Sequence, residues 1–378
     1  MYKKILVINL MHLGDLMLVT PILRTLRANF PESHIALVAD LKLADVVRLN
    51  KNLDECIFLD KKGVDDSFIG IMKFAMKLRQ KKFDLVINLH RNERASAIAA
   101  FSGGKKIVGY SKPGFSLFFE KIFPNKNPIK HQIHSHFDVL REAVGIEKFD
   151  DNGLEMWIEP AVEEKIDQVW KENFSPEDRV IALNIGASWM TKRWLDDYFA
   201  VCADHFIEKN YSIIFLGGEM DRSIVEACRG KMKFKDSDRL KIFTGKMSLA
   251  ELGAVLSRCV LFISTDSGPM HVGVAMNVPI ITMFGASPVL GFYPYDEKDF
   301  SIKTPEYCHP CNLHECPRQG DYKLACMKNI RPEVVIKYAE QLLEEYGMPA
   351  REIPRRKWKY ISRVISISPD EARQIDGT

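Results

Sequence analysis

Short apolar runs that alternate with helix-forming segments recur along the chain and restrict the folds open to it. The first run, residues 4–10 (KILVINL), lacks polar alternation, which is typical of a parallel strand covered on both faces. Further runs occur at 34–39, 55–59, 83–89, 106–110, 179–184, 211–216, 240–243, 260–264 and 278–284. A helical segment is predicted after the turn at 11–15, through Arg27, and further helices are predicted at 42–49, 67–80, 92–101, 131–145, 196–209, 220–229, 248–257 and 332–346. Strands alternating with helices form doubly wound parallel sheets, so we predict an α/β protein.

Breaks in this rhythm indicate the domain boundaries. A chain of 378 residues exceeds the usual size of a single domain. The alternation stops at 112–134, and a segment near 150–176 is rich in proline and charge. We therefore predict a Rossmann-like domain over 1–160, a second over 176–346, and a basic extension over 347–378.

Composition narrows the compartment and the partners. The net charge of +3 is too small to indicate nucleic-acid binding, and no run reaches the ~20 apolar residues needed to cross a bilayer. His12 and Asp15 interrupt the apolar N-terminal stretch, and no small-residue cleavage site follows it, so we predict a buried first strand and a cytoplasmic protein. Four cysteines are scattered singly, which favours reduced thiols: Cys56, Cys202, Cys228 and Cys259.

The stretch 261–288 combines a strand, a polar turn, a short helix and a second strand, which is a βαβ unit. Its turn, 265–269 (TDSGP), places a carboxylate, a hydroxyl and a glycine where the helix begins. Unpaired helix N–H groups and the helix dipole favour an anion at such a position. An ordinary turn with Asp266 or Ser267 as N-cap is the alternative.

Other strand ends are also polar, and ligands of open α/β sheets bind there. The loop 185–193 offers Lys192 with hydroxyls that include Thr191, which suits phosphate, although it lacks the P-loop order; a solvated basic loop is the alternative. Glu219 in the next loop is suited to ribose hydroxyls or to a surface turn. Asp15 is a candidate general base or a helix N-cap. Neither domain carries G-x-G-x-x-G, which argues against a dinucleotide oxidoreductase.

Three motifs, taken together and in this order, resemble the bacterial ADP-heptose:lipopolysaccharide heptosyltransferases of glycosyltransferase family 9. They are His12-Leu13-Gly14-Asp15 with Thr20-Pro21, 184–189 (NIGASW) with 191–194 (TKRW), and 265–271 (TDSGPMH) with Phe284-Gly285. The resemblance extends from residue 1 to about residue 346.

The resemblance implies a GT-B architecture, in which two Rossmann-like domains face each other with the active site in the cleft between them. It implies an inverting transfer that needs no metal or cofactor, with Asp15 as general base and Lys192 on the donor diphosphate. It also places Asp266 near the donor sugar. The remaining donor-side candidates are Thr191, Glu219, Met247 at the adenine, Ser267 and Gly268 in the phosphate-binding turn, and His271.

The expected reaction is transfer of L-glycero-D-manno-heptose from ADP-heptose to a lipid-linked lipopolysaccharide inner-core acceptor, either Kdo or heptose. Arg91 and Arg94, which follow the strand at 83–89, are candidates for anionic groups of the acceptor; helix-surface arginines are the alternative. A same-fold transferase with another nucleotide-sugar donor or a non-core acceptor, an NAD-dependent enzyme, and a non-catalytic nucleotide-binding protein remain alternative functions.

Two regions depart from the simplest family pattern. The spacing Cys308-x2-Cys311-x4-Cys316-x9-Cys326 would suit a zinc or iron site, and a reduced packed loop is the alternative. The extension carries Arg351, Arg355, Arg356, Lys357, Lys359 and Arg363 beside Trp358 and Tyr360. Basic and aromatic residues together suit an anionic membrane, so the extension predicts peripheral contact with the inner membrane; a solvated tail is the alternative.

Overall fold

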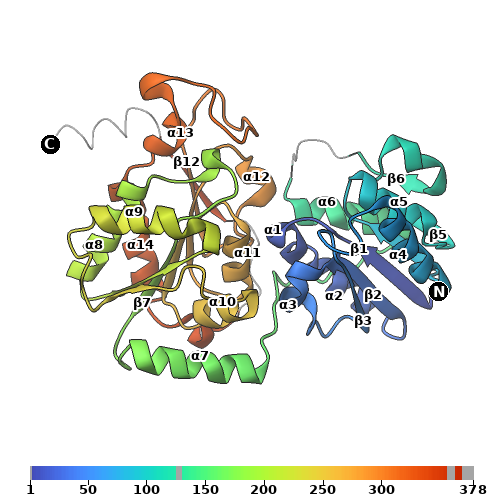
Figure 1. The fold of residues 1–378 in the computed structure, drawn as a ribbon, viewed down its shortest axis with the longest axis horizontal. Helices are drawn as coiled ribbons and strands as arrows, with labels where there is room; N and C mark the ends of the chain where they lie inside the picture. The colour runs from blue at the N-terminus through green and yellow to red at the C-terminus, as the bar shows by residue number, and fades with distance from the viewer. Residues whose placement is uncertain (1, 125–129, 356–361, 368–378) are drawn as a thin grey trace. The chain divides into compact units, whose positions relative to one another are not determined.

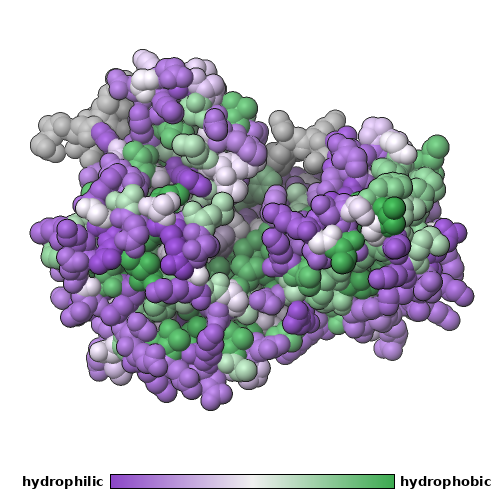
Figure 2. Space-filling view, viewed as in Figure 1, coloured by the Kyte–Doolittle hydropathy of each residue, from purple (hydrophilic) through white to green (hydrophobic). Residues whose placement is uncertain are grey.

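The structure, a computed structural model, describes residues 2–124, 130–355 and 362–367. The chain divides into two compact units, Met1–Trp157 and Ile158–Thr378, and each is built around one parallel sheet (Figure 1). The two predicted Rossmann-like α/β domains are therefore present. Most side chains on the face drawn in Figure 2 are hydrophilic. In the described part of the chain, no helix has the length and apolar character needed to cross a membrane.

The N-terminal unit contains a six-stranded sheet in the order β3-β2-β1-β4-β5-β6, in which all neighbours are parallel. Its strands are β1 (Lys4–Ile8), β2 (His34–Asp40), β3 (Glu55–Leu59), β4 (Leu85–Asn88), β5 (Lys106–Gly109) and β6 (Lys121–Ile122). Its helices are α1 (Leu13–Met17), α2 (Thr20–Asn29), η1 (Leu41–Leu43), α3 (Ala44–Val47), α4 (Phe68–Gln80), α5 (Glu93–Phe101), η2 (Pro113–Phe118), α6 (Gln132–Val139) and the π-helical η3 (Leu140–Val144). Ile5 and Ile8 of β1 are completely buried, which confirms a central strand covered on both faces.

The structure forms two helices where the sequence predicts a turn at 11–15 followed by one helical segment through Arg27. Helix α1 ends at Met17 and α2 begins at Thr20, whose hydroxyl donates to the Met17 carbonyl at 2.8 Å. Pro21 lies in the first turn of α2, where its missing N–H costs no intrahelical hydrogen bond. The break isolates a short helix directly after β1, and this helix carries Asp15.

The C-terminal unit contains a seven-stranded parallel sheet in the order β13-β12-β11-β10-β7-β8-β9. Its strands are β7 (Val180–Asn184), β8 (Ser212–Leu216), β9 (Leu240–Ile242), β10 (Leu261–Thr265), β11 (Ile280–Met283), β12 (Phe300–Lys303) and β13 (Arg363–Ser366). Its helices are α7 (Pro160–Asn173), η4 (Met190–Lys192), α8 (Asp196–Glu208), η5 (Glu219–Asp221), α9 (Arg222–Lys231), α10 (Leu249–Leu256), α11 (Gly268–Ala275), α12 (Val289–Phe292), η6 (Gly320–Tyr322), α13 (Ala325–Lys328), α14 (Pro332–Glu345) and η7 (Ala350–Glu352).

Helix α7 occupies most of the segment that the sequence left without regular structure. Pro160 lies in its first turn, and its charged residues cover a solvent face, with Ile166 as its one buried residue. The buried guanidinium of Arg258 anchors the helix by ion pairs to Glu163 at 2.7 Å and Asp167 at 2.6 Å. The proline and the charges therefore belong to a helix that packs on the C-terminal unit.

Part of the basic extension is a strand of the second sheet. Strand β13 pairs in parallel with β12, and the Arg363 guanidinium lies 3.9 Å from the centre of the Phe300 ring. Arg363 also forms an ion pair with Glu345 at 3.0 Å. Arg355 donates to the Ala275 carbonyl, and Arg351 lies 3.6 Å from Asp167. The other basic and aromatic residues of the predicted membrane contact lie outside the described residues, namely Arg356, Lys357, Trp358, Lys359 and Tyr360.

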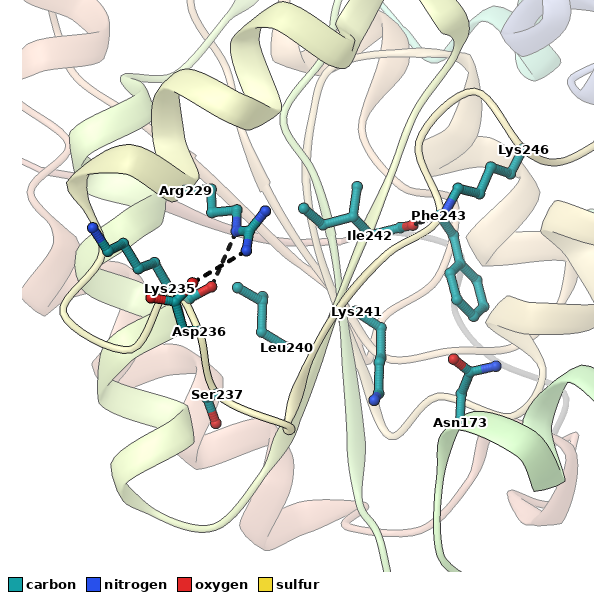
Figure 3. A pocket seen from close by; sticks show the side chains of 10 residues that line it. All are labelled: Asn173, Arg229, Lys235, Asp236, Ser237, Leu240, Lys241, Ile242, Phe243 and Lys246. Carbon is teal, nitrogen blue, oxygen red and sulfur yellow. Dashed lines mark hydrogen bonds and ion pairs between the residues drawn. The ribbon is translucent and has the colours of Figure 1, made fainter.

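The opposite edge of this sheet, β9, borders a polar pocket of about 400 Å³ (Figure 3). Arg229 donates to the Lys235 carbonyl at 3.0 Å and forms an ion pair with Asp236 at 3.3 Å. The Lys246 ammonium donates to the Ile242 carbonyl at 2.9 Å. Lysines beside an edge strand discourage its pairing with another chain. We therefore interpret the lysines that line this pocket as protection of the sheet edge.

Candidate functional site

The turn between β10 and α11 has the geometry that the βαβ motif predicted. Strand β10 ends at Thr265, and Ser267 takes the N-cap position of α11. Among the described residues, no side chain caps this helix: the Ser267 hydroxyl donates to the Thr265 carbonyl at 3.3 Å, and the Asp266 carboxylate lies elsewhere. At this end of α11, Pro269 has no N–H and the Met270 amide donates to the Ser267 carbonyl at 3.1 Å, which leaves the Gly268 amide as the helix N–H that can face another acceptor.

Lys192 and Asp266 form an ion pair at 2.9 Å, with side chains 19% and 5% exposed. The Ser287 hydroxyl donates to the same carboxylate oxygen. The structure therefore brings together the residue predicted for the diphosphate and the residue predicted for the donor sugar. A buried carboxylate needs compensating partners, and Lys192 and Ser287 supply them to Asp266.

Thr191 holds its loop against the cysteine-containing loop. Its hydroxyl donates to the Leu313 carbonyl, and its amide donates to the His314 carbonyl at 3.4 Å. A Cβ at Gly285 would come within 2.3 Å of the Thr191 carbonyl oxygen, so only glycine allows this close approach. The hydroxyl predicted to contact the donor is engaged with backbone instead.

Two stacked aromatic rings lie beside the Lys192 side chain. The Trp189 ring stacks on His314 with centroids 4.2 Å apart, and the Lys192 ammonium lies 4.7 Å from the centre of the Trp189 ring. Cation–π contact and stacking restrict the conformations open to Lys192. Sequence reasoning missed His314 and Ser287: His314 lies in the cysteine-containing loop, and Ser287 follows β11 at a strand end that was not among the turns singled out.

Asn184 joins the ends of two neighbouring strands, β7 and β10. Its side-chain amide donates to the Ser267 hydroxyl at 3.0 Å, the Gly186 carbonyl at 3.1 Å and the Ser264 hydroxyl at 3.3 Å. The Thr265 hydroxyl donates to the same Gly186 carbonyl at 2.8 Å. The motif starting at Asn184 was recognised in the sequence, but the structure shows that this residue positions the turn.

His271 belongs to the first half of α11, close to Asp266, and is 3% exposed. Burial lowers the pKa of its imidazole to about 4; the nearby Asp266 carboxylate works against this, and Lys192 adds to it. The ring is therefore neutral near pH 7. Its Nδ1 has no hydrogen-bond partner among the described residues.

Glu219 and Met247 lie on two loops that touch. Glu219 is exposed and forms an ion pair with Arg222 at 2.7 Å, while Met247 is half-buried just before α10. The amide of Gly245 donates to the Gly217 carbonyl at 2.9 Å, which holds the two loops together. This arrangement suits a base and a ribose bound along the two loops.

The buried carboxylate of this region is Asp221, which sequence reasoning did not single out. It accepts from the Gly218 amide at 2.9 Å and packs against Gly186, where a Cβ would lie 2.3 Å from the carboxyl group. The Asp221 side chain therefore fixes the position of the loop that begins the Lys192 segment.

Asp15 is the third residue of α1 and is half-buried. His12 holds the N-cap position, so the alternative in which Asp15 is the N-cap does not describe this helix.

Charged side chains also gather at the carboxyl ends of β1 and β2. Lys61 forms an ion pair with Asp40 at 2.8 Å and donates to the Leu10 carbonyl at 2.8 Å. Burial, Lys61 and His12 lower the pKa of His90 to about 4. Sequence reasoning missed Lys61, Asp40 and His90.

The two arginines predicted for the acceptor differ in their surroundings. Arg94 forms an ion pair with Asp66 at 2.8 Å and donates to the Lys61 carbonyl at 3.3 Å. Arg91 is exposed just before α5. The structure thus commits the charge of Arg94 within the unit and leaves that of Arg91 at the surface.

The loop with four cysteines packs against the donor-side loops. All four cysteines are free and half-buried. Burial of Cys326, together with the other three cysteines nearby, raises its pKa to about 12. Within the described ranges, no three His, Cys, Asp or Glu side chains are grouped to hold a metal ion. The Asn312 amide donates to the Ala286 carbonyl at 2.8 Å, which ties the loop to the segment that carries Ser287.

Two Rossmann-like parallel-sheet domains, the second with a cation and a carboxylate paired at its strand ends, define the fold class of the GT-B glycosyltransferases. Residues 71–321 match the profile of glycosyltransferase family 9 (heptosyltransferase), and the chain belongs to this family.

The chain is similar over most of its length to relatives found by sequence and by solved structure. Lipopolysaccharide heptosyltransferase 3 of Escherichia coli K12 is 24% identical over 88% of this chain and 96% of its own length. A family 9 glycosyltransferase from Veillonella parvula DSM 2008 superposes with a TM-score of 0.82 at 35% identity, over 91% of this chain and 98% of that one. The E. coli ADP-heptose LPS heptosyltransferase II superposes with a TM-score of 0.72 at 19% identity, over 90% of this chain and 99% of that one. The iron-containing glycosyltransferase TibC of E. coli H10407 shares the fold at a TM-score of 0.55 and 13% identity, over 91% of this chain and 77% of that one.

Proposed function

We propose that this chain transfers L-glycero-D-manno-heptose from ADP-heptose to an inner-core sugar, Kdo or heptose, of a lipid-linked lipopolysaccharide acceptor in the cytoplasm. The observation that carries the proposal is the Lys192–Asp266–Ser287 cluster beside the uncapped start of α11. Membership in a heptosyltransferase family and the names of the relatives support the choice of ADP-heptose.

On the donor side, the diphosphate exchanges with the Asp266 carboxylate as the partner of Lys192. The ammonium and the amides of Ser267 and Gly268 then stabilise the negative charge that grows on the leaving ADP. Asp266, released from Lys192, accepts hydrogen bonds from the sugar hydroxyls. Ser287 keeps the carboxylate oriented during this exchange.

On the acceptor side, Asp15 is the general base. It removes the proton from the acceptor hydroxyl while that oxygen attacks the anomeric carbon and ADP departs, so a single displacement inverts the configuration. Lys192 and the helix amides supply the positive potential that a metal would otherwise provide, so we propose a metal-independent transfer.

Calorimetry with ADP, UDP, GDP and NAD tests the proposal. We expect ADP to bind most tightly, because the Lys192 site holds a diphosphate and the loops with Glu219 and Met247 hold the adenosine. Preferential binding of UDP or GDP would favour another donor sugar nucleotide. Preference for NAD, or no binding of any nucleotide, would contradict the heptosyltransferase function.

For the acceptor, Arg91→Ala is expected to raise the KM by about tenfold or more, since a hydrogen bond to a charged group contributes about 1.5–3 kcal/mol. The effect of Arg94→Ala is expected to be smaller, because Asp66 already pairs with this guanidinium. The measurement is the acceptor KM at saturating donor, with the exposed Arg141→Ala as control. An unchanged KM in Arg91→Ala would remove this residue from the acceptor site.

A further inference from the structure

The outward face of α4 in the N-terminal unit carries large apolar side chains. The helix packs inward through Phe74, Ala75 and Leu78. On the outward side, Phe68 is 71% exposed, Ile69 is 66% exposed and Met76 is 48% exposed. Figure 2 shows apolar surface on this unit in the region where Figure 1 places α4 and α5.

These side chains form one continuous surface. Phe68, Met72 and Met76 follow each other at a spacing of four residues, and Ile69, Lys73 and Lys77 form the adjacent row, so the two rows lie side by side along the helix. The same six residues, with Gln80, line an open groove of about 460 Å³. We call these six residues the α4 face. Scattered apolar side chains are ordinary on a surface, whereas such a contiguous row marks an interaction site.

The charged residues of α4 and its C-terminal end are all positive, while Asp65, Asp66 and Asp84 lie just outside this stretch. Residues 67–83 contain five cations, Lys73, Lys77, Arg79, Lys81 and Lys82, and no Asp or Glu. Lys81 is paired with Glu55 at 2.6 Å. Lys73 and Lys77 are exposed and form no ion pair with any residue that the structure describes. Their flexible stems can follow the apolar row while their ammonium groups reach outward.

We propose that the α4 face docks this protein on an anionic lipid membrane. An apolar helix face bordered by lysines is suited to lie in the plane of the headgroups, with the apolar side chains in the acyl region and the ammonium groups among lipid phosphates. The absence of acidic residues from 67–83 favours an anionic surface over a protein partner of mixed charge. Only the biological reason for docking, a lipid-linked acceptor, depends on the proposed function; the binding of vesicles does not.

Sedimentation of the full chain with vesicles tests the proposal. The vesicles contain phosphatidylglycerol and phosphatidylethanolamine, or phosphatidylcholine alone. We expect binding to the anionic vesicles that weakens with salt and exceeds binding to phosphatidylcholine. Ile69→Asp with Met76→Asp, and separately Lys73→Gln with Lys77→Gln, are each expected to lower the vesicle affinity by about tenfold or more. Val201→Asp changes a side chain 46% exposed on α8 of the other unit and serves as the matched control.

Each outcome has a separate meaning. Equal vesicle binding by the wild-type protein and the α4 variants, or binding that depends only on the basic extension, would overturn the proposal. Self-association that the α4 substitutions abolish, without vesicle binding, would assign the face to a second copy and also overturn it. Circular dichroism and thermal unfolding of the same variants report on folding. Failure of the unchanged protein to bind ADP would contradict the proposed function and leave the vesicle result standing.

Discussion

Asp15→Asn is expected to lower kcat by at least about 100-fold while ADP binding stays close to normal. The substitution keeps the shape of the side chain in α1, but an amide cannot take up the proton of the acceptor hydroxyl. The residues proposed to bind ADP belong to the other unit, so the ADP affinity is expected to be unaffected. Single-turnover kinetics and ADP calorimetry on the same preparation measure the two effects.

Asp45→Asn is the matched control for this experiment. Asp45 also lies in the first turn of a short helix of the N-terminal unit, α3, where it is half-buried. A general loss of helix stability would appear in both variants, whereas loss of the base would appear only in Asp15→Asn. If Asp15→Asn kept most of its kcat with chemistry rate-limiting, the base would be another residue, and His12 at the N-cap would be the next candidate.

Lys192→Ala is expected to weaken ADP binding by about 1.5–3 kcal/mol, which is roughly a tenfold to hundredfold rise in Kd. It is also expected to destabilise the protein, because the buried Asp266 carboxylate loses its cation and keeps only the Ser287 hydroxyl. Lys192→Ala with Asp266→Asn removes the uncompensated charge. The double variant is therefore expected to recover stability without recovering ADP affinity.

Denaturant unfolding and calorimetry on the two single variants and the double variant separate the two roles. Lys233→Ala is the control, because its side chain is 68% exposed and pairs with Glu208 on the surface. Equal ADP affinity in the unchanged protein and Lys192→Ala would refute the phosphate role of this lysine. A double variant that regained ADP affinity would show that Asp266, and not Lys192, controls binding.

The sequence identified the two sheets because their inner strands are buried on both faces and read as apolar runs. Strands β12 and β13 were missed because neither reads as a long apolar run. Strand β12 is four residues long and follows the buried charges Asp296, Lys298 and Asp299, and β13 lies in a basic segment. Helix α7 was missed because proline and charge also describe a loop, and its one buried residue gives little periodic signal.

The candidate site was predictable where a strand end and its turn carry the chemistry. Lys192 and Asp266 were found in this way, and the structure shows them in contact. The groups that hold them come from distant parts of the sequence. Ser287 follows the next strand, and His314 is part of the cysteine-containing loop, so only the folded chain shows that they support the site.

Strand β13 has a consequence for any attempt to shorten the protein. A chain cut at about residue 346, where the family resemblance stops, would lack the strand that covers β12. The Phe300 ring would lose the guanidinium of Arg363, and a row of backbone N–H and C=O groups would be left open. Such a row templates strands from other copies, so the trimmed protein would tend to aggregate. A segment whose composition suggests an appendage is thus a strand of the sheet and covers β12.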